Sequence, residues 1–404
     1  MNKRIYKYTL IVQALLLFGS CKKPYAPSTI TSGSSLLVVE GSINTGADST
    51  IIHLTHTIPL SAPAGTTLPP ELKAIVMVES DANATYALTE TGNGYYVSGG
   101  LNLNANNKYR LKIVTSENKT YESDFVTVKN SPPIDSVSFR ALNTGVQINV
   151  STHDPSNNSR YYRYQYEETW IIHAYYESTL MVSKTQDESG KMVDTIIARD
   201  AAHQIYTCWS SGKSSDIVLG STDKLTRDVL ANAPVTFIDS HSEKVSSRYS
   251  ILVKQQALTK EGFEYYQQLS KNTEKIGGVF DPQPSSLTGN IHNIANPSEQ
   301  VIGYITAGAI AQKRFYIDKS DLPGEEQYLA KLPFELCSVD SLYYINPKTG
   351  INTVKAIYNG SVIPILPMAK PMKPPFGYTA AAGICVDCTL RGTNVRPAFW
   401  TNQF

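Results

Sequence analysis

Two cysteines near the C-terminus have the spacing found in redox-active and metal-binding sites. Cys385 and Cys388 are separated by two residues, while Cys208 and Cys337 lie far away in the sequence. The C-x-x-C spacing occurs in thiol–disulfide oxidoreductases and in zinc sites, and it is equally compatible with structural disulfides. The surrounding sequence and the compartment of the protein decide among these three chemistries.

A fifth cysteine, Cys21, follows a segment with the features of an export signal. Basic residues precede a short, largely apolar run at 10–18, and Gly19 and Ser20 supply the small residues that a signal peptidase requires. The run is too short to cross roughly 30 Å of hydrocarbon as a permanent helix. We therefore expect residues 1–20 to be a lipoprotein signal peptide. The thiol of Cys21 would then be diacylated, with palmitate-type chains, and hold the protein on a membrane.

Export favours structural disulfides over the two alternatives. Compartments outside the cytoplasm are oxidising, and the even number of cysteines after Cys21 allows complete pairing. A zinc site would need a second closely spaced pair or nearby histidines, and a thioredoxin-like motif would begin a helix after a strand. We therefore expect two disulfides among Cys208, Cys337, Cys385 and Cys388, and the sequence is compatible with all three pairings.

A row of aromatic residues is the candidate ligand-binding site. Tyr162, Tyr164, Tyr166 and Trp170 recur at even spacing, so a strand would direct all four to one face. Such a face could stack a sugar ring or another flat ligand. Packing between strands uses tyrosine just as readily, and we favour packing as the interpretation of this row.

The remaining polar residues indicate no catalytic or metal site. His53 and His56 are three apart, so a strand would direct them to opposite faces. Asp154, Ser156 and Asn158 alternate as in a calcium loop, but the glycine and closing glutamate of such a loop are missing, and an Asx turn explains them better. We predict no catalytic residue, no metal ligand and no cofactor. Two acids that meet only in the fold, as in glycoside hydrolases, are the alternative.

Composition and charge indicate a β-rich protein that does not bind nucleic acid. The 404-residue chain has a formal charge of +1, and removal of the three basic residues of the leader leaves about −2. Lys and Arg form no cluster of the kind on which nucleic-acid binding depends. The 25 tyrosines, with frequent Asn, Ser and Thr, favour strands and polar loops over helix bundles.

Strands dominate the first part of the mature chain. Residues 21–35 are rich in Pro, Ser and Thr and predict a flexible tether. Short apolar or alternating segments then recur over 36–130, separated by turn residues. About seven short strands at such spacing predict an immunoglobulin-like β-sandwich over 36–130. Pro132 and Pro133 mark the hinge that follows, because prolines cannot continue a central strand.

A larger β-rich domain is expected over 134–404. Alternating segments such as 146–150 predict strands, and one segment predicts a helix near 260–272. Thr259 is a good N-cap for that helix, and apolar residues follow it at helical spacing. The C-terminal part is rich in loops and ends at 397–400 in an aromatic plug that we expect to fix the chain end in the fold. The predicted fold class is therefore mainly β, with one short helix.

Several segments together resemble a known protein family. The segments at 277–284 and 385–400 are the most specific part of this resemblance. They resemble a Bacteroidota family of outer-membrane lipoproteins known as domain of unknown function 4249, and the resemblance covers nearly the whole mature chain. The weaker matching segments lie at 37–41, 207–209, 289–291 and 301–304.

The resemblance implies a location more than a chemistry. Members are commonly encoded beside SusC-like TonB-dependent transporters, so such a barrel is an expected partner and the outer membrane an expected location. The family has no assigned catalytic residues, and none is carried over. Lys22 and Lys23 stand where surface-exported relatives often carry acids, so the periplasmic and the surface face of the membrane are both compatible with the sequence.

Three functional hypotheses follow. The leading one is a lipid-anchored, non-enzymatic accessory that caps a TonB-dependent transporter or hands ligand to it. The second is a stand-alone glycan-binding lipoprotein, which requires the face of Tyr162, Tyr164, Tyr166 and Trp170 to be exposed. The third is a hydrolase, which requires two close acids in a concave pocket. The helical-repeat fold of SusD-like lipoproteins is not expected, because the chain is rich in strands.

Overall fold

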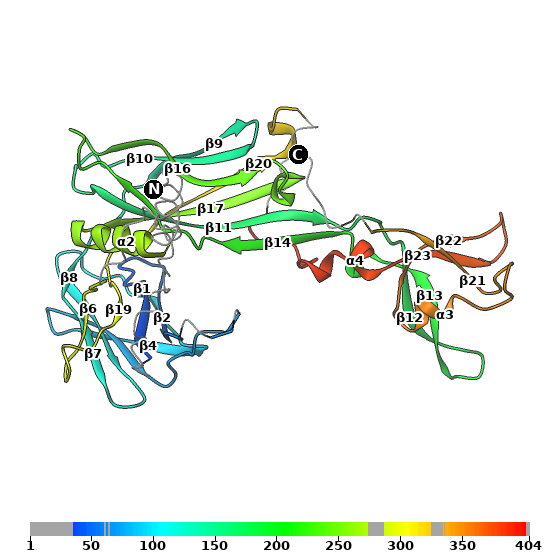
Figure 1. The fold of residues 1–404 in the computed structure, drawn as a ribbon, viewed down its shortest axis with the longest axis horizontal. Helices are drawn as coiled ribbons and strands as arrows, with labels where there is room; N and C mark the ends of the chain where they lie inside the picture. Colours follow the sequence, from blue (N-terminus) through cyan, green and yellow to red (C-terminus); the bar gives the residue numbers. More distant parts are fainter. Residues whose placement is uncertain are drawn as a thin grey trace, which may run out of the picture. The chain divides into compact units, whose positions relative to one another are not determined.

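The computed structural model describes residues 35–59, 62–63, 65–273, 287–324, 334 and 336–400. The predicted signal peptide, Cys21, nearly all of the predicted tether and the segment at 277–284 lie outside these residues. Strands supply most of the regular secondary structure among the described residues (Figure 1), which confirms the mainly β fold class. Among the described residues no helix is both long enough and apolar enough to span a bilayer.

The first part of the described chain forms a β-sandwich. Its described strands are β1 (Leu37–Ser42), β2 (Ser49–His56), β3 (Ile75–Ser80), β4 (Thr85–Gly92), β5 (Tyr95–Gly100), β6 (Lys108–Val114), β7 (Thr120–Ser123), β8 (Val126–Thr127), β18 (Ile291–Asn293) and β19 (Ile302–Gly303). They follow the order β18-β7-β6-β3-β4-β5-β2-β1-β19, with β8 beside β6. β4 connects the two layers, because its first half pairs with β3 and its second half with β5.

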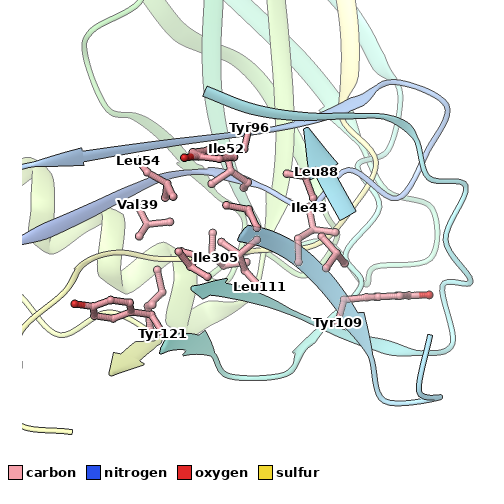
Figure 2. Packing of buried hydrophobic residues seen from close by; sticks show 14 of the residues in the cluster. Val39, Ile43, Ile52, Leu54, Leu88, Tyr96, Tyr109, Leu111, Tyr121 and Ile305 are labelled. Carbon is pink, nitrogen blue, oxygen red and sulfur yellow. The ribbon is translucent and has the colours of Figure 1, made fainter. Parts of the chain in front are cut away.

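Strand alternation decides which side chains fill this sandwich. In β6, Tyr109, Leu111 and Ile113 are buried, while the residues between them point outward. All three belong to the same apolar core as Leu54 of β2, and Figure 2 shows Tyr109, Leu111 and Leu54 among its members. Ile305 packs into the same core, although it lies almost two hundred residues further along the chain. Each fully buried aliphatic side chain contributes about 1.5–3 kcal/mol to folding.

The sandwich extends beyond the predicted boundary at residue 130. β18 pairs with β7, and β19 pairs in parallel with β1, so residues 291–303 form both edges of the first sandwich. The predicted boundaries assign these residues to the second domain instead. Strands of two and three residues are too short to show a periodicity, so the sequence pattern contains no sign of their return.

A second sandwich follows. Its smaller sheet has the order β16-β10-β9, and its larger sheet has the order β14-β11-β17-β20 with β15 beside β11. The facing sides of the two sheets share one apolar core. The strands are β9 (Ile134–Leu142), β10 (Gly145–His153), β11 (Tyr161–His173), β14 (Thr207–Lys213), β15 (Val218–Ser221), β16 (Val229–Asp239), β17 (Arg248–Leu258) and β20 (Ala311–Asp318).

The predicted helix is confirmed and covers the outer face of the larger sheet. It is α2 (Lys260–Thr273), and the N–H of Gly262 donates to Thr259 Oγ1 at 3.2 Å, as expected of an N-cap. The ring of Tyr266 lies 4.2 Å from the guanidinium carbon of Arg163, which projects from β11 on that side. The first residues of β11 are therefore covered on both faces, on one by the smaller sheet and on the other by α2.

The C-terminal residues form a smaller unit, here called the C-terminal module (336–390). In its sheet β23 lies between β21 and β22, and the hairpin β12–β13 packs against it through Leu180, Ile357 and Tyr378. The hairpin consists of β12 (Leu180–Gln186) and β13 (Met192–Ala198). The elements of the module are β21 (Asp340–Tyr343), α3 (Lys355–Tyr358), β22 (Ile363–Met368), β23 (Gly377–Ala381) and α4 (Gly383–Val386).

Candidate functional site

The predicted aromatic row lies on β11, but it faces the core of the second sandwich. The exposed fractions of Tyr162, Tyr164 and Tyr166 are 0 %, 1 % and 8 %. Trp170 is partly buried, and the ammonium of Lys244 lies 5.1 Å from its ring centroid. The row therefore packs between sheets, and the interpretation of these four residues as a ligand-stacking face is wrong.

The smaller sheet supplies hydrogen-bond acceptors for two of these phenols. The hydroxyl of Tyr162 donates to Asp228 Oδ2 at 2.6 Å, and that of Tyr166 donates to Thr236 Oγ1 at 3.0 Å. Burial and the neighbouring Asp228 carboxylate raise the pKa of Tyr162 far above its ordinary value, so the phenol stays a donor. The hydroxyl of Tyr164 has no partner among the described residues. This polar pairing explains why a tyrosine-rich face can be buried.

The acid that continues this row is also fully engaged. Glu168 is buried, forms an ion pair with Lys244, and accepts a hydrogen bond from the hydroxyl of Tyr249 at 2.9 Å. Because both carboxylate oxygens of Glu168 have partners, neither is free to act on a substrate. The pair instead fixes Lys244 over Trp170 at the end of the row.

A surface cavity of about 440 Å³ on the first sandwich is lined by two acids, Glu79 and Asp81. Such a cavity is what the hydrolase hypothesis requires. Burial would raise the pKa of Glu79, but the hydrogen bonds and charges of Arg110 and Lys112 outweigh it and hold that pKa below its ordinary value. A catalytic acid needs a raised pKa. Glu79 therefore stays ionised at neutral pH and cannot donate a proton to a leaving group.

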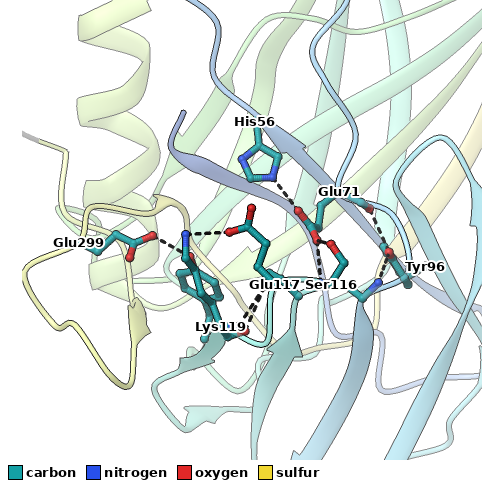
Figure 3. A network of polar contacts seen from close by, with 10 residues as sticks. His56, Glu71, Tyr96, Ser116, Glu117, Lys119 and Glu299 are labelled. Atoms are coloured by element: carbon teal, nitrogen blue, oxygen red, sulfur yellow. Dashed lines mark hydrogen bonds and ion pairs between the residues drawn. The ribbon is translucent and has the colours of Figure 1, made fainter. Parts of the chain in front are cut away.

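Glu71 has neighbours of the types found in a hydrolase triad (Figure 3). His56 Nε2 lies 2.7 Å from Glu71 Oε2, and the Ser116 hydroxyl donates to Glu71 Oε1 at 3.1 Å. In a triad the serine donates to the histidine. Here the serine and the histidine bind opposite oxygens of one carboxylate, and Tyr96 donates to the backbone carbonyl of Glu71. The network holds the segment before β3 in place and provides no activated nucleophile.

The predicted Asx turn is confirmed at Asp154. Ser156 donates from its backbone N–H and its hydroxyl to Asp154 Oδ1, and the N–H of Asn158 donates to Oδ2 at 3.0 Å. The turn occupies the carboxylate that a calcium ion would need. His53 does not join a metal site with His56 either, because its ring stacks on Tyr95 at 4.0 Å. No cluster of three potential metal ligands occurs within the described part of the chain.

The four cysteines form two disulfides, which confirms the prediction and selects one pairing. Cys337 pairs with Cys385, and Cys208 of β14 pairs with Cys388. The two members of the C-x-x-C motif therefore bind different, distant cysteines. A redox or zinc role for Cys385 and Cys388 is excluded by this pairing, because both thiols are used as structural crosslinks.

The disulfides fix an exposed apolar surface that sequence reasoning missed. Leu336, Ile384 and Leu390 lie next to the crosslinked cysteines; Leu336 is 96 % exposed, and the other two are also exposed. Leu390 contacts α4, since a Cβ added to Gly383 would lie 3.6 Å from its Cδ1 atom. We call these three residues the disulfide-flanking patch. An exposed apolar cluster on a crosslinked scaffold is typical of an interaction site.

The predicted aromatic plug fixes the chain end in the second sandwich. Trp400 is buried, and its ring packs edge-on against Trp209 and Tyr316. The hydroxyl of Tyr316 donates to the carbonyl of Phe399 at 2.7 Å, and the guanidinium of Arg314 lies over the Phe399 ring. These contacts make the ending a part of the fold.

The chain is similar to an uncharacterised protein family. A family model described as "Domain of unknown function (DUF4249)" matches residues 22–314, more than half of the chain. No curated protein matches the chain. Among solved structures, the Yersinia pseudotuberculosis adhesin InvE is similar over 56 % of this chain and 56 % of its own, at 12 % identity and a TM-score of 0.13. The match thus spans about half of the adhesin chain, and a likeness this weak supports no argument.

Proposed function

The chain belongs to the DUF4249 family of domains of unknown function, and we propose that it is an exported lipoprotein that acts as a non-enzymatic accessory of a TonB-dependent outer-membrane transporter. The lipid anchor at Cys21 would keep it on the outer membrane beside the barrel. The disulfide-flanking patch would contact the barrel, and the role would be to cap the barrel or to hand ligand to it.

The disulfides support export. Cys208–Cys388 and Cys337–Cys385 use every cysteine after the lipidation site. Crosslinks of this kind persist in oxidising compartments and are rare in the reducing cytoplasm. This agrees with the leader at 1–20, from which the lipid anchor is expected.

The disulfide-flanking patch is the observation that carries the accessory role. Leu336, Ile384 and Leu390 expose apolar surface beside two crosslinks, which restrain the backbone next to these side chains. A preformed apolar surface loses little conformational entropy on binding, which favours docking to another protein. The face of Tyr162, Tyr164 and Tyr166, which the glycan hypothesis requires, is buried. Glu79, which lines a surface cavity together with Asp81, is tied to cations.

The test is a pull-down of the tagged, lipidated protein from native membranes in mild detergent, with partners identified by mass spectrometry. We expect a near-stoichiometric TonB-dependent barrel. The variant Ile384→Glu with Leu390→Glu should lose the barrel, because charged side chains cannot be buried in an apolar interface without a partner.

The matched control replaces two exposed apolar residues of the second sandwich, Leu225→Glu with Val229→Glu. This control should retain the barrel, and both variants should form the same disulfides as the original protein. Recovery of the protein without a barrel would contradict the accessory role. If the patch variant and the control recover the same amount of barrel, the disulfide-flanking patch is not the surface that contacts the barrel.

A further inference from the structure

The far end of the C-terminal module presents two loops side by side. Tyr343 at the end of β21 and Met368 at the end of β22 both pair with Gly377 at the start of β23. The loop after β21 and the loop between β22 and β23 therefore leave the sheet at the same end, as Figure 1 shows at the orange and red-orange strands. The N–H of Tyr344 donates to the carbonyl of Phe376 at 3.1 Å and joins the loops. We call the two loops, 344–352 and 369–376, the tip.

The tip projects apolar side chains into solvent. Ile345 is 76 % exposed, Ile351 is 63 % exposed and Met372 is fully exposed. The N–H of Asn346 donates to the carbonyl of Ile351 at 3.0 Å, so an ordered turn holds both isoleucines at its base. Met372 has a φ of 58°, a left-handed conformation that side chains with a Cβ rarely adopt. The backbone is therefore strained at Met372, whose side chain is exposed to solvent.

The charge around these side chains has one sign. From residue 341 to residue 386 the sequence contains four lysines and no Asp, Glu or Arg. Lys348, Lys370 and Lys373 belong to the tip and are exposed. The ion pairs formed within the described residues include none of these three lysines. The tip is thus an apolar surface surrounded by unneutralised positive charge.

We infer that the tip binds the surface of a phospholipid bilayer that carries anionic headgroups. Apolar side chains at the end of a loop can enter the boundary between headgroups and acyl chains, and lysines beside them pair with the phosphates. A protein partner fits less well, because lysine, which supplies all of the charged side chains of the tip, is depleted from protein interfaces. The inference goes beyond the proposed accessory role and does not depend on it, since the disulfide-flanking patch is a separate surface.

The experiment uses residues 22–404, which keep every described element but lack the lipidated cysteine, so that the anchor cannot contribute. All described strands and both disulfides lie within Leu37–Phe404, which form one compact unit. The protein is sedimented with vesicles of phosphatidylethanolamine containing phosphatidylglycerol, and separately with phosphatidylcholine vesicles. We expect sedimentation with the anionic vesicles only.

Two variants of the tip test its two components. Ile345→Ser with Met372→Ser removes apolar surface, and Lys370→Gln with Lys373→Gln removes charge. We expect the second variant to lose affinity for the anionic vesicles by on the order of tenfold or more. One matched control, Met192→Ser with Leu225→Ser, removes exposed apolar side chains from the β12–β13 hairpin and from the second sandwich. The other, Lys184→Gln with Lys191→Gln, removes two lysines of the hairpin. Both controls should bind as the original protein does.

Three outcomes would overturn the inference. The first is that the original protein does not sediment with anionic vesicles. The second is that the tip variants and their controls sediment equally well. The third is that the tip variants keep their vesicle binding but lose a protein partner in the membrane pull-down, which would make the tip a protein-docking surface. A barrel retained by tip variants and lost by the patch variant would separate this inference from the accessory role.

Discussion

The hydroxyl of Tyr162 donates a 2.6 Å hydrogen bond to the carboxylate of Asp228 and joins the two sheets of the second sandwich. Tyr162 lies on β11 in the larger sheet, and Asp228 immediately precedes β16 in the smaller one. Asp228 is 1 % exposed and accepts a second hydrogen bond from Thr222 Oγ1. A buried carboxylate is stable only when such donors replace the water it has lost.

The variant Tyr162→Phe should lower the free energy of unfolding by about 1.5–3 kcal/mol, because it leaves the buried Asp228 with one donor fewer. Urea unfolding followed by circular dichroism measures the change. The control is Tyr164→Phe, two residues along the same face. The hydroxyl of Tyr164 is buried without a partner among the described residues, so its removal should leave the stability unchanged or raise it. An equal loss in both variants would show that the Asp228 bond is not the cause.

Low pH should destabilise the first sandwich, because Glu79 becomes protonated. The cations Arg110 and Lys112 hold the pKa of Glu79 below its unfolded value of 4.5, so the folded state binds fewer protons. The stabilisation by Glu79 is therefore fully present above pH 4.5 and is lost as pH falls through the folded pKa. Glu79→Gln should be less stable than the original protein at neutral pH, and the difference should shrink in acid.

Urea unfolding at a series of pH values measures this convergence. Glu117→Gln is the control, because Glu117 pairs with Lys119 while 73 % of its side chain is exposed. An exposed ion pair contributes roughly 0–1 kcal/mol, so this control should stay close to the original protein throughout the series. A Glu79→Gln difference that does not change with pH would contradict the ion-pair explanation.

The two disulfides should differ in how much they stabilise the protein. Cys208–Cys388 closes a loop of 180 residues, and Cys337–Cys385 closes one of 48. A longer loop loses more entropy in the unfolded chain, and each bond should contribute about 2–5 kcal/mol. The double variant Cys208→Ser with Cys388→Ser should therefore be the less stable of the two double variants in guanidinium unfolding. Peptide mapping without reduction should recover these two crosslinks, and a Cys385–Cys388 crosslink would refute the pairing.

The chain end should contribute strongly to stability. Trp400→Ala removes a buried ring that packs against Trp209 and Tyr316, and it should cost about 3–5 kcal/mol. Val395→Ala, at an exposed position a few residues earlier, should change the stability by no more than about 0.5 kcal/mol. Thermal unfolding followed by tryptophan fluorescence would distinguish the two. A Trp400→Ala protein as stable as Val395→Ala would mean that the end does not hold the fold.

Local periodicity was sufficient to predict individual elements. The alternation from Tyr161 to Trp170 predicts a strand, and β11 spans that segment. The cap at Thr259 with helical spacing after it predicts α2 within one residue of its end. Both patterns depend only on neighbours along the chain, which a sequence displays directly.

The functional meaning of the tyrosine face could not be derived in the same way. Alternation shows that Tyr162 and Tyr164 share a face, but it does not show what covers that face. The cover is the smaller sheet, whose partner Asp228 lies more than sixty residues away in the sequence. The pairing of Cys385 with Cys337 is equally non-local. The positive charge of the tip, in contrast, can be recognised from the sequence alone, because the 46 residues from 341 to 386 contain no Asp or Glu.

The return of residues 291–303 to the first sandwich sets the order in which its strands can pair as the chain is made. A chain is synthesised from its N-terminus, so β1 and β7 are made long before β19 and β18. Until then the hydrogen-bonding groups at both margins of the sheet have no partner strand, and such margins recruit other chains. Both edges of the sheet therefore stay open to pairing with other chains until residues 291–303 have been made.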